Sequence, residues 1–149
     1  MLKKILLAID GSDHGMKAVD YALRLAQIEG GEVEIIYVIA NLDKRINVTG
    51  HMDPDLGFHL QEKTEEALNE EGKMILDQGK AKFQDTDISC TTKLLTGNPA
   101  VVILHEAEKQ NADVIVMGSR GLSGITRFVM GSVSSKVVNH AHCSVFIVR

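Results

Sequence analysis

The sequence predicts an α/β fold in which an open parallel sheet of five strands carries helices on both faces. Short apolar runs, typical of strands buried on both sides, alternate with longer segments whose apolar residues recur at helical spacing. An alternation of this kind builds a parallel sheet covered by helices. The length of 149 residues and the hydrophobic content of 44% fit a single domain, residues 1–149, with one substantial core.

The first strand and the first helix have clear signals. Residues 5–9 form a continuous apolar run, and Ser12 follows with a hydroxyl suited to cap a helix. The helix should end at Gly30-Gly31, because glycine adopts the left-handed conformation after a helix at little cost. A second strand is expected over residues 33–39. The apolar stripe that marks the helix consists of Val19, Ala22, Leu23 and Ala26.

The middle of the chain is less regular. Residues 41–59 show no clean period and are predicted to form a long loop or crossing segment. The helix that follows contains Gly72 and Gly79, which cost helix stability and which we expect to allow close packing against the sheet. Residues 88–95 include several Thr and Ser and suit an edge strand. The apolar face of the helix is completed by Leu68, Ile75, Leu76 and Phe83.

The second half continues the alternation. Asn98 as an N-cap and Pro99 at the first helical position predict the start of a helix. Residues 114–117 are predicted to form a buried strand, residues 131–140 a helix and residues 145–148 the last strand.

Charge and composition exclude several classes of function. The 16 Lys and Arg residues against 20 Asp and Glu residues give a net charge of −4, whereas a nucleic-acid-binding face needs excess positive charge. The run at residues 5–9 is too short for a signal peptide, and no stretch approaches the roughly 20 apolar residues of a membrane span. We therefore expect a cytoplasmic protein without a membrane span, in which Cys90 and Cys143 stay reduced.

Two strand ends are the places to search for a ligand, because open parallel sheets bind ligands where the strand order reverses. The first strand ends in residues 10–13 (DGSD), and the fourth leads into Gly118, Gly121 and Gly124. After a further interval, Gly131-Ser132 opens the next helix. Glycines let main-chain amides approach phosphate oxygens, and a helix start adds donors and positive potential. On spacing alone, turn formation and ordinary helix capping remain the alternative.

Three segments of the sequence form a recognisable set: residues 4–12 (KILLAIDGS), 112–121 (ADVIVMGSRG) and 131–134 (GSVS). With these segments, the chain resembles the universal stress protein family over nearly its whole length. The ATP-binding branch of the family is marked by the pattern G-x2-G-x9-G-[ST], and neither a P-loop nor a G-x-G-x-x-G pattern competes with it here. The resemblance implies a Rossmann-like sheet of strand order 3-2-1-4-5. The residues that match the pattern are Gly118, Gly121, Gly131 and Ser132.

The resemblance also implies a site for ATP, with AMP or ADP as alternatives, and for Mg²⁺ bound with the nucleotide. Main-chain groups of Val38 would read the base, and Asp10 would face the ribose or a metal held by the phosphates. The residues expected around adenine and ribose are Ala8, Ile9, Asp10, Val38, Met117 and Gly118. The residues expected around the phosphates are Arg120, Gly121, Gly131, Ser132, Val133 and Ser134.

The last strand is expected to make the protein a homodimer. Residues 143–148 are apolar and lie at an edge of the predicted sheet, where an uncovered strand invites pairing with another chain. The family resemblance likewise implies a homodimer, formed through this C-terminal edge strand.

Three functions are compatible with these features. The first is a regulatory stress-response protein that binds ATP and signals to an unidentified protein partner. The second is an enzyme, a slow ATP hydrolase or phosphoryl transferase, although Asp13 and His14 are weak candidates for a base and no catalytic residue is assigned. The third is a structural dimer that has lost nucleotide binding, which the intact glycine pattern opposes. No separate metal site is expected, because His140, His142 and Cys143 lack a fourth ligand.

Overall fold

Five parallel strands form one sheet. The computed structural model describes residues 1–40, 64–119 and 130–149, and the strands in these ranges follow the order β3-β2-β1-β4-β5. The predicted fold class and strand order are therefore confirmed. The strands are β1 (Lys4–Ala8), β2 (Glu32–Ala40), β3 (Cys90–Gly97), β4 (Val114–Gly118) and β5 (Ser144–Val148).

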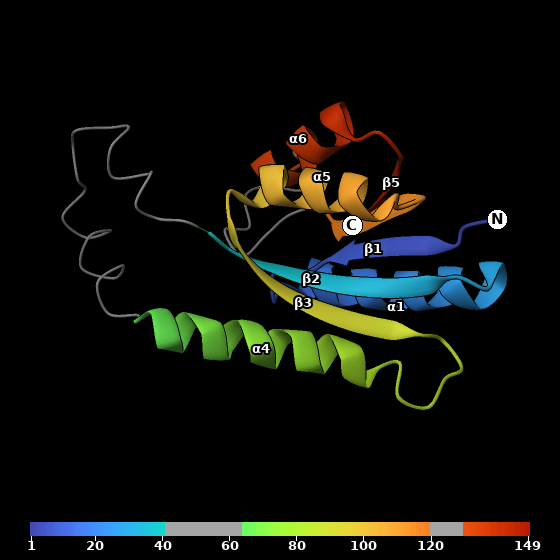
Figure 1. Ribbon diagram of the computed structural model, residues 1–149, viewed down its shortest axis with the longest axis horizontal. Coiled ribbons are helices and arrows are strands. Elements are labelled where there is room, and N and C mark those ends of the chain that lie inside the picture. Colours follow the sequence, from blue (N-terminus) through green and yellow to red (C-terminus); the bar gives the residue numbers. More distant parts are fainter. Residues whose placement is uncertain (41–63, 120–129) are drawn as a thin grey trace.

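Helices cover both faces of the sheet. Figure 1 shows α1 and α4 on one face and α5 and α6 on the other. The observed bounds differ from the expected ones by only a few residues, and the predicted loop at 41–59 lies outside the described residues. No helix in the described ranges combines the length and the apolar character that crossing a membrane requires. The helices are α1 (Asp13–Glu29), α4 (Glu65–Ala81), α5 (Pro99–Gln110) and α6 (Ser132–His140).

The predicted helix ends are confirmed at the level of single hydrogen bonds. Ser12 caps α1, and its Oγ accepts from the amide of Gly15 at 3.1 Å. Asn98 caps α5, and its Oδ1 accepts from the amide of Val101 at 3.2 Å. Gly30 ends α1 in the left-handed conformation, with φ 76°, which L-residues adopt only with strain.

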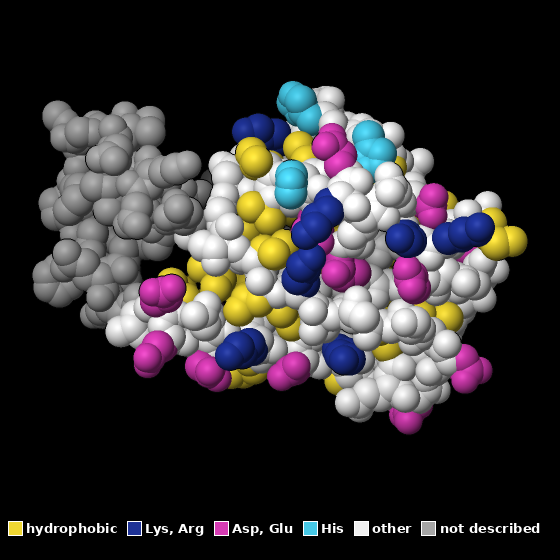
Figure 2. Space-filling model, viewed as in Figure 1, with side chains coloured by type: hydrophobic (Ala, Val, Ile, Leu, Met, Phe, Trp, Pro, Cys, Tyr) yellow, Lys and Arg dark blue, Asp and Glu magenta, His cyan; other side chains and the backbone are white. Residues whose placement is uncertain are grey.

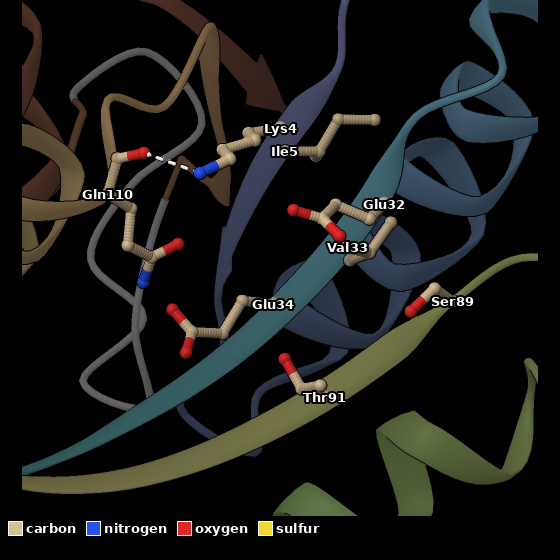
Figure 3. A pocket seen from close by; sticks show the side chains of 8 residues that line it. All are labelled: Lys4, Ile5, Glu32, Val33, Glu34, Ser89, Thr91 and Gln110. Atoms are coloured by element: carbon tan, nitrogen blue, oxygen red, sulfur yellow. Dashed lines mark hydrogen bonds between the residues drawn. The ribbon is translucent and has the colours of Figure 1, made fainter.

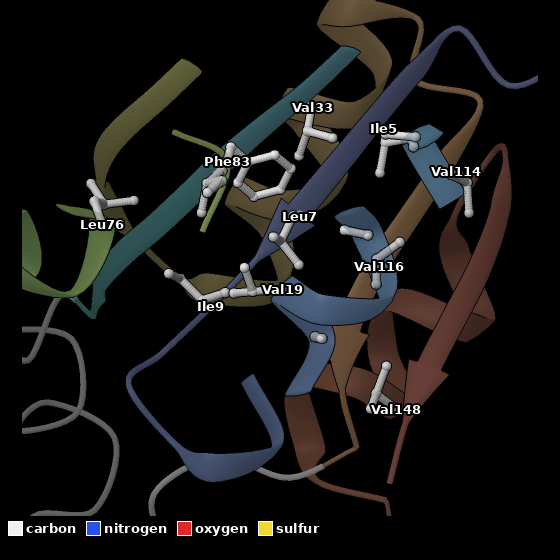
Figure 4. Packing of buried hydrophobic residues seen from close by; sticks show 14 residues of the cluster. Ile5, Leu7, Ile9, Val19, Val33, Leu76, Phe83, Val114, Val116 and Val148 are labelled. Carbon is white, nitrogen blue, oxygen red and sulfur yellow. The ribbon is translucent and has the colours of Figure 1, made fainter. Parts of the chain in front are cut away.

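The core has two layers, one on each side of the sheet. Along β1, Ile5 and Leu7 face α1 and α4, whereas Leu6 and Ala8 face α5 and α6. Figure 4 shows the first layer, in which Leu7 lies among side chains from the neighbouring strands and from α1. Burial on both faces explains why the central strands are continuous apolar runs rather than alternating ones.

The glycines of α4 allow this helix to lie close to the sheet, as the sequence predicts. A Cβ atom at Gly72 would lie 2.6 Å from Cδ1 of Leu94 and 3.0 Å from Cδ1 of Tyr37. A Cβ atom at Gly79 would lie 3.2 Å from Cδ1 of Ile9. Close packing of α4 on β2 and β3 therefore offsets the intrinsic cost of glycine within a helix.

Candidate functional site

The carboxyl ends of β1 and β4 lie side by side at the centre of the sheet. Ala8, the last residue of β1, is paired with Met117 of β4. The helix that follows β1 covers one face, and the helix that follows β4 covers the other. The helices that follow these two strands therefore diverge, and a crevice at this switch point is where open parallel sheets are expected to bind ligands.

The residues expected around the adenine do not all face the same way. Ala8, Val38 and Met117 belong to the layer on the α5 and α6 side of the sheet. The side chain of Ile9 belongs to the opposite layer, beneath α4, and its amide donates to the carbonyl oxygen of Ile36 at 3.1 Å. Only the main-chain carbonyl of Ile9 is left to contribute to a pocket on the α5 and α6 side.

Asp10 is held at the end of β1 by its own loop. Its Oδ1 accepts a hydrogen bond from the amide of Ser12 at 2.9 Å, which fixes the orientation of this half-buried carboxylate. A Cβ atom at Gly15 would lie 3.1 Å from that oxygen, so the start of α1 approaches Asp10 closely. The carboxylate is therefore pre-oriented before any ligand arrives.

Ser119 joins four elements at this edge of the sheet. Its amide donates to the carbonyl oxygen of Val148 at 2.8 Å, and its carbonyl oxygen accepts from the amide of Gly131 at 2.7 Å. The same carbonyl oxygen accepts from Oγ of Ser134 at 2.9 Å. The hydroxyl of Ser119 lies 3.0 Å from Nδ1 of His14, in hydrogen-bond contact. This buried serine thus links β4 to β5, α6 and α1.

The start of α6 presents main-chain amides without a side-chain cap. Gly131 is the N-cap residue and supplies no capping side chain. The first intrahelical bond reaches the amide of Ser135, so the helix itself provides no acceptor for the amides of Ser132, Val133 and Ser134. These three amides, with the positive end of the helix dipole, are suited to an anion.

Two of the predicted phosphate-binding groups have other partners in this structure. The amide of Gly131 and the hydroxyl of Ser134 both donate to Ser119. They therefore position the start of α6 instead of offering free hydrogens to the crevice. Arg120 and Gly121 lie outside the described residues, so their predicted contacts stay predictions.

Sequence reasoning missed the contact between His14 and Ser119. These residues are 105 positions apart, and no periodicity or motif connects them. Ser119 follows Gly118 in the predicted ligand-binding segment. Its hydroxyl contacts His14 of α1, and its carbonyl oxygen accepts hydrogen bonds from the start of α6.

A hollow of about 220 Å³ lies at the opposite, amino-terminal end of the strands. Figure 3 shows Lys4 reaching the end of α5, where its Nζ donates to the carbonyl oxygen of Gln110 at 3.2 Å. Near this hollow, Lys93 Nζ and Gln110 Nε2 both donate to Oε1 of the buried Glu106, at 2.6 and 2.9 Å.

Lys and Arg are interspersed with Asp and Glu on the face shown in Figure 2, so this face carries no extended area of one charge sign.

Glu34 is the unusual residue of that hollow. Its Oε2 is shielded from solvent and has no hydrogen-bond partner among the described residues. Burial raises the pKa of this carboxyl, and the nearby Lys93 only partly opposes the rise. By contrast, although burial opposes it, hydrogen bonds from Lys93 and Gln110 lower the pKa of Glu106. The fold therefore disfavours the ionised form of Glu34 and favours that of Glu106.

We expect Glu34→Gln to raise the thermal stability of the protein at about pH 8. An acid whose pKa is raised on folding stabilises the fold below its unfolded-state pKa and loses this contribution as the pH rises through the folded value. The amide cannot ionise, so the gain in Tm should amount to a few degrees at about pH 8 and disappear by about pH 4. Differential scanning calorimetry across this range measures the effect. Glu32→Gln, at an exposed position of the same hollow, controls for the change in net charge, and an equal gain there would contradict the explanation.

Comparison with known proteins supports one family. The family profile described as "Universal stress protein family" matches residues 1–149. The universal stress protein MJ0531 of Methanocaldococcus jannaschii is 34% identical, over 100% of this chain and 83% of its own. The universal stress protein YxiE of Bacillus subtilis is 35% identical, over 100% of both chains.

Solved structures show the same fold. The universal stress protein UspA from Lactobacillus plantarum matches with a TM-score of 0.76 and 27% identity, over 99% of this chain and 98% of that one. More distant matches were solved with nucleotides: a universal stress protein in complex with cAMP (22% identity, TM-score 0.71), one from Archaeoglobus fulgidus with dAMP (18%, 0.69) and one from Arabidopsis thaliana with AMP (20%, 0.65). These three cover at least 98% of this chain and at least 90% of their own.

Proposed function

The chain belongs to the universal stress protein family, and we propose that it binds ATP with Mg²⁺ in the crevice between the ends of β1 and β4. The observation that carries the proposal is the start of α6, which has no side-chain cap and lies next to the end of β4. Three amides of its first turn have no acceptor within the helix. A helix start of this kind is a site for a phosphate group. Its position at the switch point of the sheet is where a nucleotide is expected.

The proposed complex assigns a role to each part of the crevice. Ala8 and Val38 would face the adenine on the α5 and α6 side, and Met117 would lie under the ribose. Asp10, already oriented by Ser12, would accept from a ribose hydroxyl or bind Mg²⁺ held by the phosphates. The main-chain carbonyl oxygen of Ile9 and the backbone of Gly118 would complete the part of the crevice that contacts adenine and ribose.

The phosphate half would be formed by main-chain groups. The amides of Ser132, Val133 and Ser134 and the exposed hydroxyl of Ser132 are the donors suited to it. Gly131 and Ser134 would act mainly by fixing α6 through Ser119. The sequence pattern adds Arg120 and Gly121 to this half, as charge partner and as a close-approaching amide.

The nucleotides of related structures support the adenosine half of the proposal. Their ligands, cAMP, dAMP and AMP, share an adenine, a pentose and one phosphate. The pattern G-x2-G-x9-G-[ST] marks the ATP-binding branch that the chain resembles, and this resemblance favours ATP over AMP. The residues that match it are Gly118, Gly121, Gly131 and Ser132. We propose a regulatory, cytoplasmic binding protein rather than an enzyme. Nδ1 of His14, one candidate base, contacts the hydroxyl of Ser119, and this hydroxyl is buried.

We expect ATP with Mg²⁺ to raise the Tm of the protein. A ligand of the native state at 100 times its Kd stabilises by about 2.7 kcal/mol, which corresponds to roughly 5–11 °C for a chain of this size. Differential scanning fluorimetry with ATP, AMP and GTP measures both the shift and the preference for adenine. The absence of any shift at millimolar ATP would instead favour a structural module that has lost the nucleotide.

We also propose a homodimer formed through β5. This strand is an edge of the sheet, and apolar side chains are exposed on both sides of it. Phe146 of β5 lies 5.5 Å from Tyr21 of α1, measured between ring centroids, and both rings are exposed. Val138 of α6 is exposed on the other side. A second copy would pair with the free strand edge and cover these side chains.

Phe146→Asp should convert the dimer to a monomer. The substitution places a charge where the partner's apolar surface would lie, so we expect dimer affinity to fall at least about tenfold, the effect of about 1.4 kcal/mol. Size-exclusion chromatography with light scattering measures the state. Val101→Asp, which adds the same charge at an exposed apolar position of α5, should leave the dimer intact. A dimer unchanged by Phe146→Asp would place the interface elsewhere.

A further inference from the structure

We infer that His14 is a positioning residue that sets the phosphate half of the nucleotide site through Ser119. The inference rests on the proposed nucleotide function and adds a determinant that lies outside the glycine pattern. It concerns the relative affinity for ligands with and without phosphates, because the hydrogen bond of the His14 side chain leads through Ser119 to the start of α6.

The first step is the contact between α1 and β4. Nδ1 of His14 lies 3.0 Å from Oγ of Ser119. The two elements are in direct contact there, since a Cβ atom at Gly118 would lie 2.9 Å from Cβ of His14 and 3.0 Å from its main-chain carbon. The half-buried imidazole is thereby held against the residue that follows β4.

The second step leads from Ser119 to the start of α6. The carbonyl oxygen of Ser119 accepts both the amide of Gly131 and the hydroxyl of Ser134. Gly131 has no side-chain cap, so these two bonds to one carbonyl orient the first turn of α6. His14 holds the side chain of Ser119, and the main chain of the same residue orients the amides of Ser132 and Val133.

The effect of His14 on phosphate affinity can be distinguished from an effect on the stability of the whole fold. The bond between His14 and Ser119 joins α1 to the residue that follows β4, whereas Ala8, Val38 and Met117 are fixed by the core layer between the sheet and the helices α5 and α6. Loss of the bond should therefore weaken contacts to phosphates and leave contacts to the nucleoside unchanged. A preorganised anion site loses affinity when its donors are free to reorient.

The test compares ATP with adenosine on His14→Ala by isothermal titration calorimetry. Loss of one net hydrogen bond predicts ATP binding that is weaker by about 3- to 10-fold, with adenosine affinity unchanged within about 2-fold. His14→Asn should restore most of the ATP affinity, because the asparagine amide can occupy the place of Nδ1. A general loss of stability would not change the ratio of the two affinities and would not be rescued in this way.

Two further variants make the result specific. Ser119→Ala should have the effect of His14→Ala, and the double variant should be no weaker than either, because both remove the same interaction. His140→Ala is the matched control. His140 ends α6, far from its first turn, and its Nδ1 contacts the carbonyl oxygen of Lys136 within the same helix. The loss of this contact should leave both affinities unchanged.

A readout without nucleotide keeps this inference separate from the proposed function. The amide resonance of Gly131 should shift in His14→Ala and remain in place in His140→Ala. An unchanged Gly131 resonance, or an ATP-to-adenosine ratio equal to that of the wild type, overturns the role of His14. Wild-type protein that binds neither ligand overturns the nucleotide function, whatever the resonance shows.

Discussion

Gly131→Asp should abolish detectable nucleotide binding while the protein becomes slightly more stable. An N-cap side chain points over the amides of the second and third helical residues, which here are Val133 and Ser134. A carboxylate at this position would accept hydrogen bonds from the amides that we assign to phosphate, and it would also repel the phosphate. The predicted loss of affinity for ATP is at least about 100-fold, equivalent to about 2.7 kcal/mol.

The same substitution improves the helix. The backbone of Gly131 has φ −61° and ψ 160°, an extended conformation that any L-residue adopts. Aspartate caps a helix better than glycine by a few tenths of a kcal/mol, and its charge adds a favourable interaction with the helix dipole. We expect a gain in the free energy of unfolding of roughly 0.5–1 kcal/mol. Affinity and stability should therefore change in opposite directions.

Calorimetry with ATP and thermal unfolding without ligand measure these two effects on one variant. Asn98→Asp is the matched control, since it places the same charge at the N-cap of α5, where Asn98 already accepts from Val101. The control should bind ATP as the wild type does. If Gly131→Asp binds ATP normally, the start of α6 does not hold the phosphates, and the glycine segment serves only as a turn.

The fold could be predicted from the sequence because its determinants are local. Ser12, Asn98 and Gly30 each act within one turn of a helix end, and their residue types identify the boundaries. The central strands are apolar throughout because both faces of the sheet are covered. Even the glycines of α4 could be interpreted, since a glycine within an apolar helical face indicates close packing.

The candidate site could be predicted only in part, because its determinants are not local. The place of the crevice follows from the strand order, and the amides at the start of α6 follow from the Gly-Ser pair at 131 and 132. The orientation of Ile9 toward α4 depends on where β1 ends, and a shift by one residue reverses the face. The contact between His14 and Ser119 depends on how α1 packs against β4, and no pattern in the sequence predicts that packing.

The two ends of the sheet also show how differently polar groups are used. At the amino-terminal end, Lys93 and Gln110 donate hydrogen bonds to the carboxylate of Glu106. Burial raises the pKa of Glu34 in the same hollow, so the fold favours its protonated form. At the carboxyl end, two glycines have different effects. The absence of a side chain at Gly118 lets α1 approach β4 closely, and its absence at Gly131 leaves the first-turn amides of α6 without a side-chain cap.

Gly118→Ala should destabilise the protein by about 1–3 kcal/mol, the usual cost of adding a carbon to a well-packed region. The new Cβ atom would lie 2.9 Å from Cβ of His14, 3.0 Å from its main-chain carbon and 3.1 Å from the amide nitrogen of Gly15. Because two of these atoms are main chain, rotation of a side chain cannot relieve the contact, and α1 must move away from β4. The movement would also separate His14 from Ser119.

Thermal unfolding of Gly118→Ala should show a Tm lower by roughly 2–12 °C. Gly30→Ala is the control, because the left-handed φ of Gly30 is its constraint and, apart from its chain neighbours, no atom among the described residues lies within 4 Å of the new Cβ. Its cost of about 1–2 kcal/mol is that of a left-handed backbone and needs no movement of α1. Combining Gly118→Ala with His14→Gly removes one of the three contacts, so the double variant should lose less stability than the sum of the single losses. Additive losses would mean that the close contact between α1 and the end of β4 does not limit the residue at position 118. The proposed influence of this contact on the start of α6 would then be wrong as well.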